Sequence, residues 1–309
     1  MNFITSKEKL FLALNETNKV IPIRTTLPIL GCVLIKAEQE ELTLTSTDLE
    51  QTIVVRLESK NIKTGEVAVP CGKLLEIVSA LPNTGEINVL IKEDFEIEIN
   101  SSKGVYKIIG KDPSEYPEAP KVNKQQQISL QGQELLDIIN STLYAVSKDD
   151  LKPALCGIYF NIKEKNITAV STDGHRLVKI EKETNQTNKE GSIIIPGKFF
   201  SVLKNNIKVN KELEINLSEN HISIEDEQQT TITRIIKESF PDFNSVIPET
   251  LEKKATTNTD EFVAAIKRVS IFSNKTTKQI VVNFTTNEIT ISTEDKETRS
   301  SAKEHIPCE

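Results

Sequence analysis

Three segments of this 309-residue chain repeat one pattern at nearly constant spacing, and the repeat constrains the fold more than any other feature. Each segment reads as a strand, a short polar turn and a second strand that closes on serine or threonine and an acid. The acids Asp48 and Asp173 are 125 residues apart, and Asp173 and Asp295 are 122 apart. A sequence with such a period folds as copies of one unit. The segments are 31–48, 157–173 and 280–295.

Other landmarks keep this spacing and define the repeated unit. A strand, a proline, a Gly-Lys pair and a helix occur at 67–81 and again at 192–205. A proline-rich loop follows at 111–120 and at 237–248. A helix with one apolar face opens every unit. The fold class is therefore α+β, with repeated domains that each combine helices with an antiparallel sheet.

Polar segments that are poor in core residues set the boundaries between these units. We expect a first domain at 1–124, a second at 125–250 and a third at 251–309. The third has only its first helix and about three strands, so by the spacing of the first two it is incomplete at its C-terminus. We expect this half domain to be loose or prone to aggregate, because its exposed apolar face lacks the half that would cover it.

Composition narrows the compartment and the class of partner. The net charge of −7 means that any nucleic-acid binding needs a locally basic surface. The first ten residues, MNFITSKEKL, lack the apolar stretch of a secretory signal, and no apolar run reaches membrane-spanning length. The four cysteines are far apart and form no CxxC motif. They read as reduced thiols of a cytoplasmic protein, and they do not favour a metal site.

The stretch AVSTDGHRLV, residues 169–178, allows two interpretations. In the first, Asp173 and His175 form a catalytic dyad of a hydrolase or transferase that acts on nucleic acid. In the second, Asp173 accepts backbone N–H bonds in a β-turn and Gly174 supplies a positive φ. The acid recurs in all three units whereas the histidine occurs in one, and the sequence places no nucleophile nearby. The turn interpretation is therefore favoured for Asp173, and His175, Arg176 and Leu177 indicate a function private to the second unit.

The order of these elements resembles the bacterial DNA polymerase III β subunit family, the sliding clamps, over essentially the whole chain. The segments RTTLPIL (24–30), STDLE (46–50), STDGHRL (171–177) and FPDFNSVIP (240–248) carry the resemblance. The resemblance implies a head-to-tail homodimer that closes into a ring around duplex DNA and performs no chemistry, exonuclease activity included. It also implies binding to the polymerase III catalytic subunit, the clamp loader, other polymerases and repair proteins through a short peptide motif.

The predicted helices agree with a ring around DNA. The segments 7–19, 72–82, 133–147, 197–208 and 260–274 hold nine Lys/Arg and seven Asp/Glu, which leaves a net −9 on the rest of the chain. A basic lining inside an acidic shell attracts phosphates without reading bases. The residues that we expect to contact DNA are Arg24, Lys73, Lys198, Lys204 and Arg268.

The resemblance also assigns a peptide pocket and a dimer seam. Apolar residues would anchor the peptide, while His175 and Arg176 would frame the rim. The pocket would include Lys152, Leu155, Thr172, Gly174, His175, Arg176, Leu177, Pro241 and Val246. The seam would join Tyr106 and Ile108 of one subunit to Ile271 and Phe272 of the next. Because the third unit lacks its second half, we do not expect the 309 residues to close a ring alone.

This chain departs from the family where many clamps carry tyrosines on the DNA-facing loop, since Pro153 and Ala154 stand there. Lys152 also replaces a common arginine and loses the bidentate fork. No nucleotide-binding or zinc-protease motif occurs, so no cofactor is expected. Asp48 and Glu50 have the spacing of a strand pair that could hold a metal, but solvated turn carboxylates are the favoured interpretation.

Overall fold

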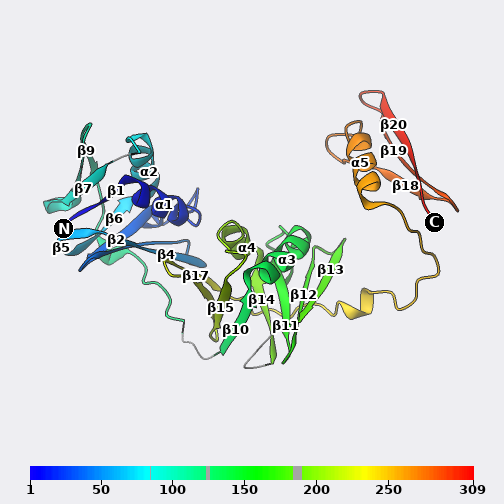
Figure 1. Cartoon of the computed structure of the whole chain (residues 1–309), viewed down its shortest axis with the longest axis horizontal. Coiled ribbons are helices and arrows are strands. Elements are labelled where there is room, and N and C mark those ends of the chain that lie inside the picture. Colours follow the sequence, from blue (N-terminus) through cyan, green and yellow to red (C-terminus); the bar gives the residue numbers. More distant parts are fainter. Residues whose placement is uncertain (84, 123–125, 184–189) are drawn as a thin grey trace. The chain divides into compact units, whose positions relative to one another are not determined.

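The computed structural model describes residues 1–83, 85–122, 126–183 and 190–309. The chain divides into two compact units, Met1–Pro241 and Asp242–Glu309. Both complete copies of the repeated pattern lie in the first unit (Figure 1). The boundary predicted between residues 124 and 125 lies outside the described residues.

The first copy of the repeat combines two antiparallel sheets with two α-helices. Ser6 caps the first helix, because its hydroxyl oxygen accepts a hydrogen bond from the Lys9 backbone N–H at 3.2 Å. A strand precedes this helix, although the sequence analysis placed the helix first. The elements are β1 (Asn2–Ser6), α1 (Lys7–Asn18), η1 (Pro28–Gly31), β2 (Cys32–Glu38), β3 (Glu41–Thr47), β4 (Gln51–Glu58), β5 (Lys60–Lys63), β6 (Gly65–Pro70), α2 (Cys71–Ala80), β7 (Glu86–Ile91), η2 (Glu93–Phe95), β8 (Glu96–Ser101), β9 (Gly104–Ile109) and η3 (Pro113–Glu115).

The second copy repeats this order, again with a strand before the helix. The Glu134 side chain accepts a hydrogen bond from the Gln131 backbone N–H at 3.0 Å and so stabilises the start of the helix. The elements are β10 (Gln126–Gln131), α3 (Gly132–Thr142), η4 (Leu143–Ala145), η5 (Pro153–Cys156), β11 (Gly157–Ile162), β12 (Asn166–Thr172), β13 (Leu177–Glu183), β14 (Gly191–Pro196), α4 (Gly197–Leu203), β15 (Glu212–Leu217), β16 (His221–Glu225) and β17 (Gln229–Arg234).

Each copy builds its own hydrophobic core between helices and sheets. In the first copy, Leu14 of α1 and Val78 of α2 are fully buried in one cluster. In the second, Leu135 and Ile139 of α3 are fully buried with Phe199 of α4, as the apolar spacing of the predicted helix requires. In Figure 1, α3 and α4 lie on one face of the strands of this copy.

The two copies match in detail at buried hydroxyl groups. The Ser46 hydroxyl donates a hydrogen bond to the Thr17 carbonyl at 2.5 Å, and the Ser171 hydroxyl donates one to the Thr142 carbonyl at 2.7 Å. Both pairs join the second strand of the repeated hairpin to the end of the opening helix. Since each residue has its counterpart 125 positions along the chain, the period predicted from the sequence is a structural period.

One continuous sheet joins the two copies. Its strand order is β10-β15-β16-β17-β4-β3-β2-β6, so β4 of the first copy pairs with β17 of the second. The pairing is antiparallel, with Ile53 opposite Thr231. The other sheets of the first unit have the orders β5-β1-β7-β8-β9 and β13-β12-β11-β14. Strand β13 therefore lies at a sheet edge, whereas its counterpart β4 lies inside a sheet.

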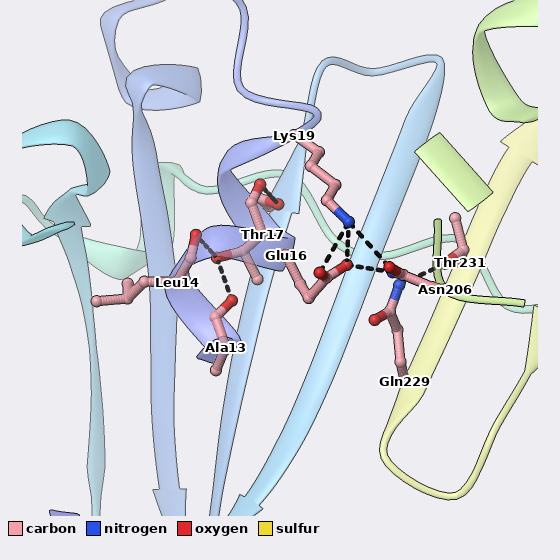
Figure 2. Close-up of polar contacts among 9 residues, drawn as sticks. Ala13, Leu14, Glu16, Thr17, Lys19, Asn206, Gln229 and Thr231 are labelled. Carbon is pink, nitrogen blue, oxygen red and sulfur yellow. Dashed lines mark hydrogen bonds and ion pairs between the residues drawn. The ribbon is translucent and has the colours of Figure 1, made fainter. Parts of the chain in front are cut away.

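A polar cluster beside this sheet also links the two copies (Figure 2). The Lys19 ammonium lies 2.6 Å from Glu16 Oε2 and donates to Asn206 Oδ1 at 3.1 Å. The Asn206 side-chain amide in turn donates to the Glu16 carboxylate. Three side chains thus connect the end of α1 to the segment after α4, and Lys19 is held by its neighbours.

The second unit is smaller. Asn258 caps its helix, because Asn258 Oδ1 accepts hydrogen bonds from the backbone N–H groups of Asp260 and Glu261 at 2.9 and 3.1 Å. Val269 packs with Ile289 and Ile291 in a small core. The elements are η6 (Asn244–Val246), α5 (Thr259–Ser270) and the sheet strands β18 (Val281–Phe284), β19 (Glu288–Asp295) and β20 (Ser300–Pro307). One helix and three strands follow 251, as predicted.

Candidate binding sites

The turn between β12 and β13 is held by Asp173. Its Oδ1 atom accepts hydrogen bonds from the backbone N–H groups of His175 and Arg176 at 3.0 and 3.1 Å. The Arg176 Nε–H donates to Asp173 Oδ2 at 3.0 Å. These bonds lower the pKa of Asp173, first of all the bond from the His175 N–H. Gly174 has a φ of +91°, so the β-turn interpretation of this segment is confirmed.

The equivalent aspartates of the other copies also accept hydrogen bonds from backbone N–H groups. Asp48 Oδ1 accepts from the backbone N–H groups of Glu50 and Gln51 at 3.0 and 2.6 Å. Asp295 Oδ1 accepts from the Glu297 N–H at 3.0 Å. All three acids therefore close a turn at the end of a strand.

The tip of the second turn presents charged and aromatic side chains to solvent. His175 and Arg176 are exposed, and the Arg176 guanidinium lies 5.5 Å from the ring centre of Tyr144 in η4. Tyr144 is itself 59% exposed and was missed by the sequence analysis. A tyrosine within the predicted helix 133–147 was the signal available, but the sequence does not bring residue 144 next to residue 176.

Other residues predicted for the pocket lie on this turn, at the start of β13, and at or just before η5. Thr172 is buried, and its hydroxyl donates to the Arg176 carbonyl at 2.7 Å, so it supports the turn. Leu155 and Leu177 are half-buried, while Lys152 is exposed. The loop is closed by the Leu155 N–H, which donates to the Lys152 carbonyl at 2.9 Å.

The last two predicted pocket residues belong to the FPDF segment. The Phe240 ring stacks on Tyr159 of β11 with ring centres 5.0 Å apart, which fixes the chain just before Pro241. Pro241 is exposed at the end of the first unit. Val246 lies in the second unit and is 67% exposed there.

The basic residues predicted to contact DNA differ in their acid partners. Arg24, Lys198 and Lys204 are exposed and form no ion pair within the described part of the chain. Lys73 lies 3.3 Å from Glu76 on the surface of α2. Arg268 forms a two-pronged pair with Glu304, with N–O distances of 2.8 and 2.6 Å. The charge of Arg268 is therefore largely engaged inside its own unit.

The residues predicted for the dimer seam lie at a sheet edge and at a helix end. Strand β9 is the outer strand of its sheet, and Tyr106 and Ile108 are half-buried against the first core. The opposite side of β9 exposes Val105 and Ile109, which the sequence analysis did not select. Ile271 and Phe272 follow α5 and are exposed in the second unit.

The described residues contain neither a candidate metal site nor a helix suited to a membrane. Over residues 1–83, 85–122, 126–183 and 190–309, no group of three or more His, Cys, Asp or Glu side chains is arranged to hold a metal ion. Within the same ranges, none of the helices combines the length and the apolar character needed to cross a membrane.

The fold of the chain is that of the DNA sliding clamps. A solved sliding clamp from Bartonella birtlesii, the polymerase III subunit beta with griselimycin bound, matches with a TM-score of 0.93 at 25% identity. The match covers 100% of this chain and 84% of that chain. The predicted α+β clamp fold is therefore confirmed.

Sequence comparisons give the family. Models of the DNA polymerase III beta subunit match at 1–120 (N-terminal domain), 129–242 (central domain) and 244–307 (C-terminal domain). The beta sliding clamp of Staphylococcus epidermidis is 31% identical over 300 residues, which are 94% of this chain and 79% of that protein. That of Staphylococcus aureus is 30% identical over 284 residues, 89% of this chain and 75% of that protein. The chain belongs to the DNA polymerase III beta subunit family.

Members of this family are non-catalytic processivity factors of DNA polymerase III, with DNA and the polymerase as partners. The role of Asp173 in the turn agrees with this membership. The alternative of a hydrolase or transferase centred on Asp173 and His175 is therefore set aside.

Proposed function

We propose that two copies of this chain's full gene product close head to tail into a ring that encircles duplex DNA and tethers the replicative polymerase. The observation that carries the proposal is the match of three successive beta-subunit modules from residue 1 to residue 307. The further partners are the clamp loader, other polymerases and repair proteins that carry clamp-binding motifs. The working compartment is the bacterial cytoplasm, where the chromosome is replicated.

The proposed domains are 1–124, 125–250 and 251–309. The proposed DNA contacts are phosphate contacts from basic side chains, so they do not depend on sequence. Arg24, Lys198 and Lys204 have the strongest support, because no described acid neutralises them. Lys73 contributes less because Glu76 competes for its charge, and Arg268 contributes least because it must leave Glu304.

The proposed peptide pocket lies beside the second turn. Leu155 and Leu177 supply apolar contact, and Pro241 is the exposed residue at the end of the first unit. Val246, in the second unit, belongs to the proposed set through the resemblance of the FPDF segment alone. Arg176, steadied by Asp173 and Tyr144, places a fixed positive charge at the rim. Lys152, Thr172, Gly174 and His175 complete the proposed set.

The proposed dimer seam pairs the edge strand β9 with the partner's third domain. A sheet edge offers unpaired backbone groups, and Tyr106 and Ile108 place apolar side chains beside it. Ile271 and Phe272 are the apolar side chains proposed to face them from the partner, and their exposure in the second unit supports this.

The test is topological. The full-length product is loaded by a bacterial clamp loader onto a nicked circular plasmid, and the bound fraction is followed by gel filtration. A ring stays on the circle and is released when one restriction cut gives it an end. Equal retention on circular and linear DNA contradicts the proposal, because ordinary electrostatic binding does not sense DNA ends.

A further inference from the structure

A cavity of about 860 Å³ lies where the two copies of the repeat meet in the first unit. Glu50, at the tip of the first turn, lines one side of this junction cavity. Ile236, just after β17, and Lys198, at the start of α4, line it from the second copy. The Arg234 N–H donates to the Glu50 carbonyl at 2.9 Å, so backbone hydrogen bonding between the copies continues to the cavity lining. A volume of this size suits a ligand of several residues.

The junction cavity includes one residue of the first turn, and the proposed peptide pocket includes the equivalent residue of the second. Glu50 and His175 are 125 positions apart and occupy equivalent places in matching turns. The proposed pocket uses the turn of the second copy, and the junction cavity uses the turn of the first. The two sites share this one position of the repeat, because the other residues that line the junction cavity come from the second copy. The junction cavity lies within the first unit.

The lining of the junction cavity indicates the chemistry of its occupant. Aliphatic and proline side chains line the cavity together with Ser147, Ser201 and Cys156, and the lining also holds three cations, Lys148, Lys198 and Arg234. None of these three has an ion-pair partner among the residues that the structure describes. Two acids, Glu50 and Asp150, leave the rim with an excess of positive charge. An occupant with aliphatic side chains and carboxylates matches both properties.

A peptide fits this lining better than a nucleic-acid strand. Single-stranded nucleic acid is generally held by bases stacked on aromatic rings. Among the described residues that line the junction cavity, none is aromatic. Short peptides, in contrast, dock aliphatic side chains into apolar grooves and use polar groups at the rim for orientation.

We propose that the junction cavity is a second binding site for an acidic, aliphatic peptide segment of a partner protein. The inference rests on the proposed function as a platform for partner peptides. Occupation would place a carboxylate beside Lys198, so that a bound partner competes with DNA phosphate for this side chain.

The test uses fluorescence anisotropy with a labelled hexapeptide of alternating leucine and aspartate, and a control peptide in which lysine replaces aspartate. The whole 309-residue chain should bind the acidic peptide at least about tenfold more tightly than the basic one. Leu177→Asp, which alters only the proposed pocket of the second turn, should leave this binding unchanged. Ser201→Trp, which fills the junction cavity from α4, should abolish it.

A matched control is Ser79→Trp. Ser79 is also exposed on a helix of the first unit and also donates to a backbone carbonyl, but it does not line the junction cavity. This variant should bind the acidic peptide like the unchanged chain. If Ser201→Trp and Ser79→Trp bind alike, or if only Leu177→Asp loses binding, the proposal is wrong.

Cys156 gives a second readout that needs no variant in the junction cavity. It lines the cavity, and it is the one cysteine of four that is not buried. Burial and the nearby carboxylates of Asp150 and Asp149 raise the pKa of this thiol, so iodoacetamide labelling is done at alkaline pH. In the Leu177→Asp background, the acidic peptide should slow labelling of Cys156. Unchanged labelling, or equal protection by an oligothymidylate, overturns the proposal.

The two proposals fail separately. Loss of the ring in the topological test, with protection of Cys156 intact, refutes the clamp function and leaves the peptide site. A normal ring with no peptide at the junction cavity refutes the second site alone.

Discussion

The turns at 47–51 and 172–176 share one pattern of hydrogen bonds but lie in different structural settings. In each, a threonine hydroxyl bonds to the carbonyl four residues on, and an aspartate bonds to the next two available N–H groups. The first turn leads into β4, which pairs with β17 inside a sheet. The second leads into β13, which lies at an edge. The same turn thus forms part of a structural joint in the first copy and lies exposed beside a sheet edge in the second.

The difference between the turns is visible in the last residue of each. Gln51 is 3% exposed, whereas the side chain of its counterpart Arg176 is 58% exposed. Repetition therefore conserves the hydrogen bonds that make the turn and leaves the tip free to vary. The comparison teaches that a repeated motif should be read for function from the residues that break the repeat.

The largest effect should come from Thr52→Asp in the first copy. Thr52 is 3% exposed and lies opposite Ile232 in the sheet that joins the two copies. A buried carboxylate without a partner should lower the free energy of unfolding by about 3–5 kcal/mol. Chemical denaturation measures this, with Thr52→Val, expected to cost about 1 kcal/mol, as the control. If Thr52→Asp is as stable as the valine variant, the first turn is not a structural joint.

Leu177→Asp, the same change at the equivalent position of the second copy, should spare the fold and remove binding. Leu177 is half-buried at a sheet edge, so the carboxylate can reach water. Loss of an apolar anchor should weaken binding of a clamp-motif peptide by about 100-fold, as for an interface hot spot. Isothermal titration measures the affinity, and Leu177→Met controls for shape. An unchanged affinity would remove the second turn from the proposed pocket.

A reciprocal pair of substitutions tests the backbone of the two turns. Leu49 and Gly174 are equivalent and both have positive φ, +76° and +91°. Gly174→Leu should cost about 1–2 kcal/mol of unfolding free energy, since nothing crowds the added Cβ and backbone strain is the main term. Leu49→Gly should change it by less than about 1 kcal/mol, because relieved strain is offset by a more flexible unfolded chain. Thermal denaturation measures both variants. If Leu49→Gly destabilises the protein more than Gly174→Leu, backbone strain does not distinguish the two turns in this way.

The smallest expected effect is the protonation of Asp173 at low pH. The pKa of Asp173 is lowered by the N–H groups of His175 and Arg176, so its contribution to stability is present at neutral pH and is lost as the pH falls through the lowered pKa. The backbone amide shifts of His175 and Arg176 in NMR spectra should titrate with a midpoint below about 3.9, the ordinary value for aspartate. Asp173→Asn should abolish the titration. A midpoint at or above the ordinary value would mean that these hydrogen bonds do not favour the charged carboxylate.

Sequence reasoning predicted the turns because their chemistry is local. Asp173 and the N–H groups that it accepts lie within four residues, and the recurrence of the acid indicated a structural role. The helix faces were predicted for a similar reason, since Leu135 and Ile139 are one helical turn apart and both are buried. The small strands β1 and β10 were missed, because five or six residues give too short an alternation to register.

What the sequence did not predict depends on contacts between distant segments. The pairing of β4 with β17 joins residues more than 170 positions apart, and either strand is compatible with other partners. The junction cavity arises only after that pairing, since Glu50 of the first copy lines it with residues of the second. The Arg176–Tyr144 contact depends on η4 and the second turn meeting within the second copy. Leu49 gave no signal for its positive φ, because leucine is not a residue that favours this conformation.

The joint between the two copies also has a mechanical meaning. Five residue pairs of β4 and β17 form a ladder, and the Glu16–Lys19–Asn206 cluster ties the helix layer beside it. A force that pulls the two copies apart must break the strand pairing and the polar cluster together, because both connect the first copy to the second. Under tension the two copies should therefore stay joined while segments outside the sheets extend first.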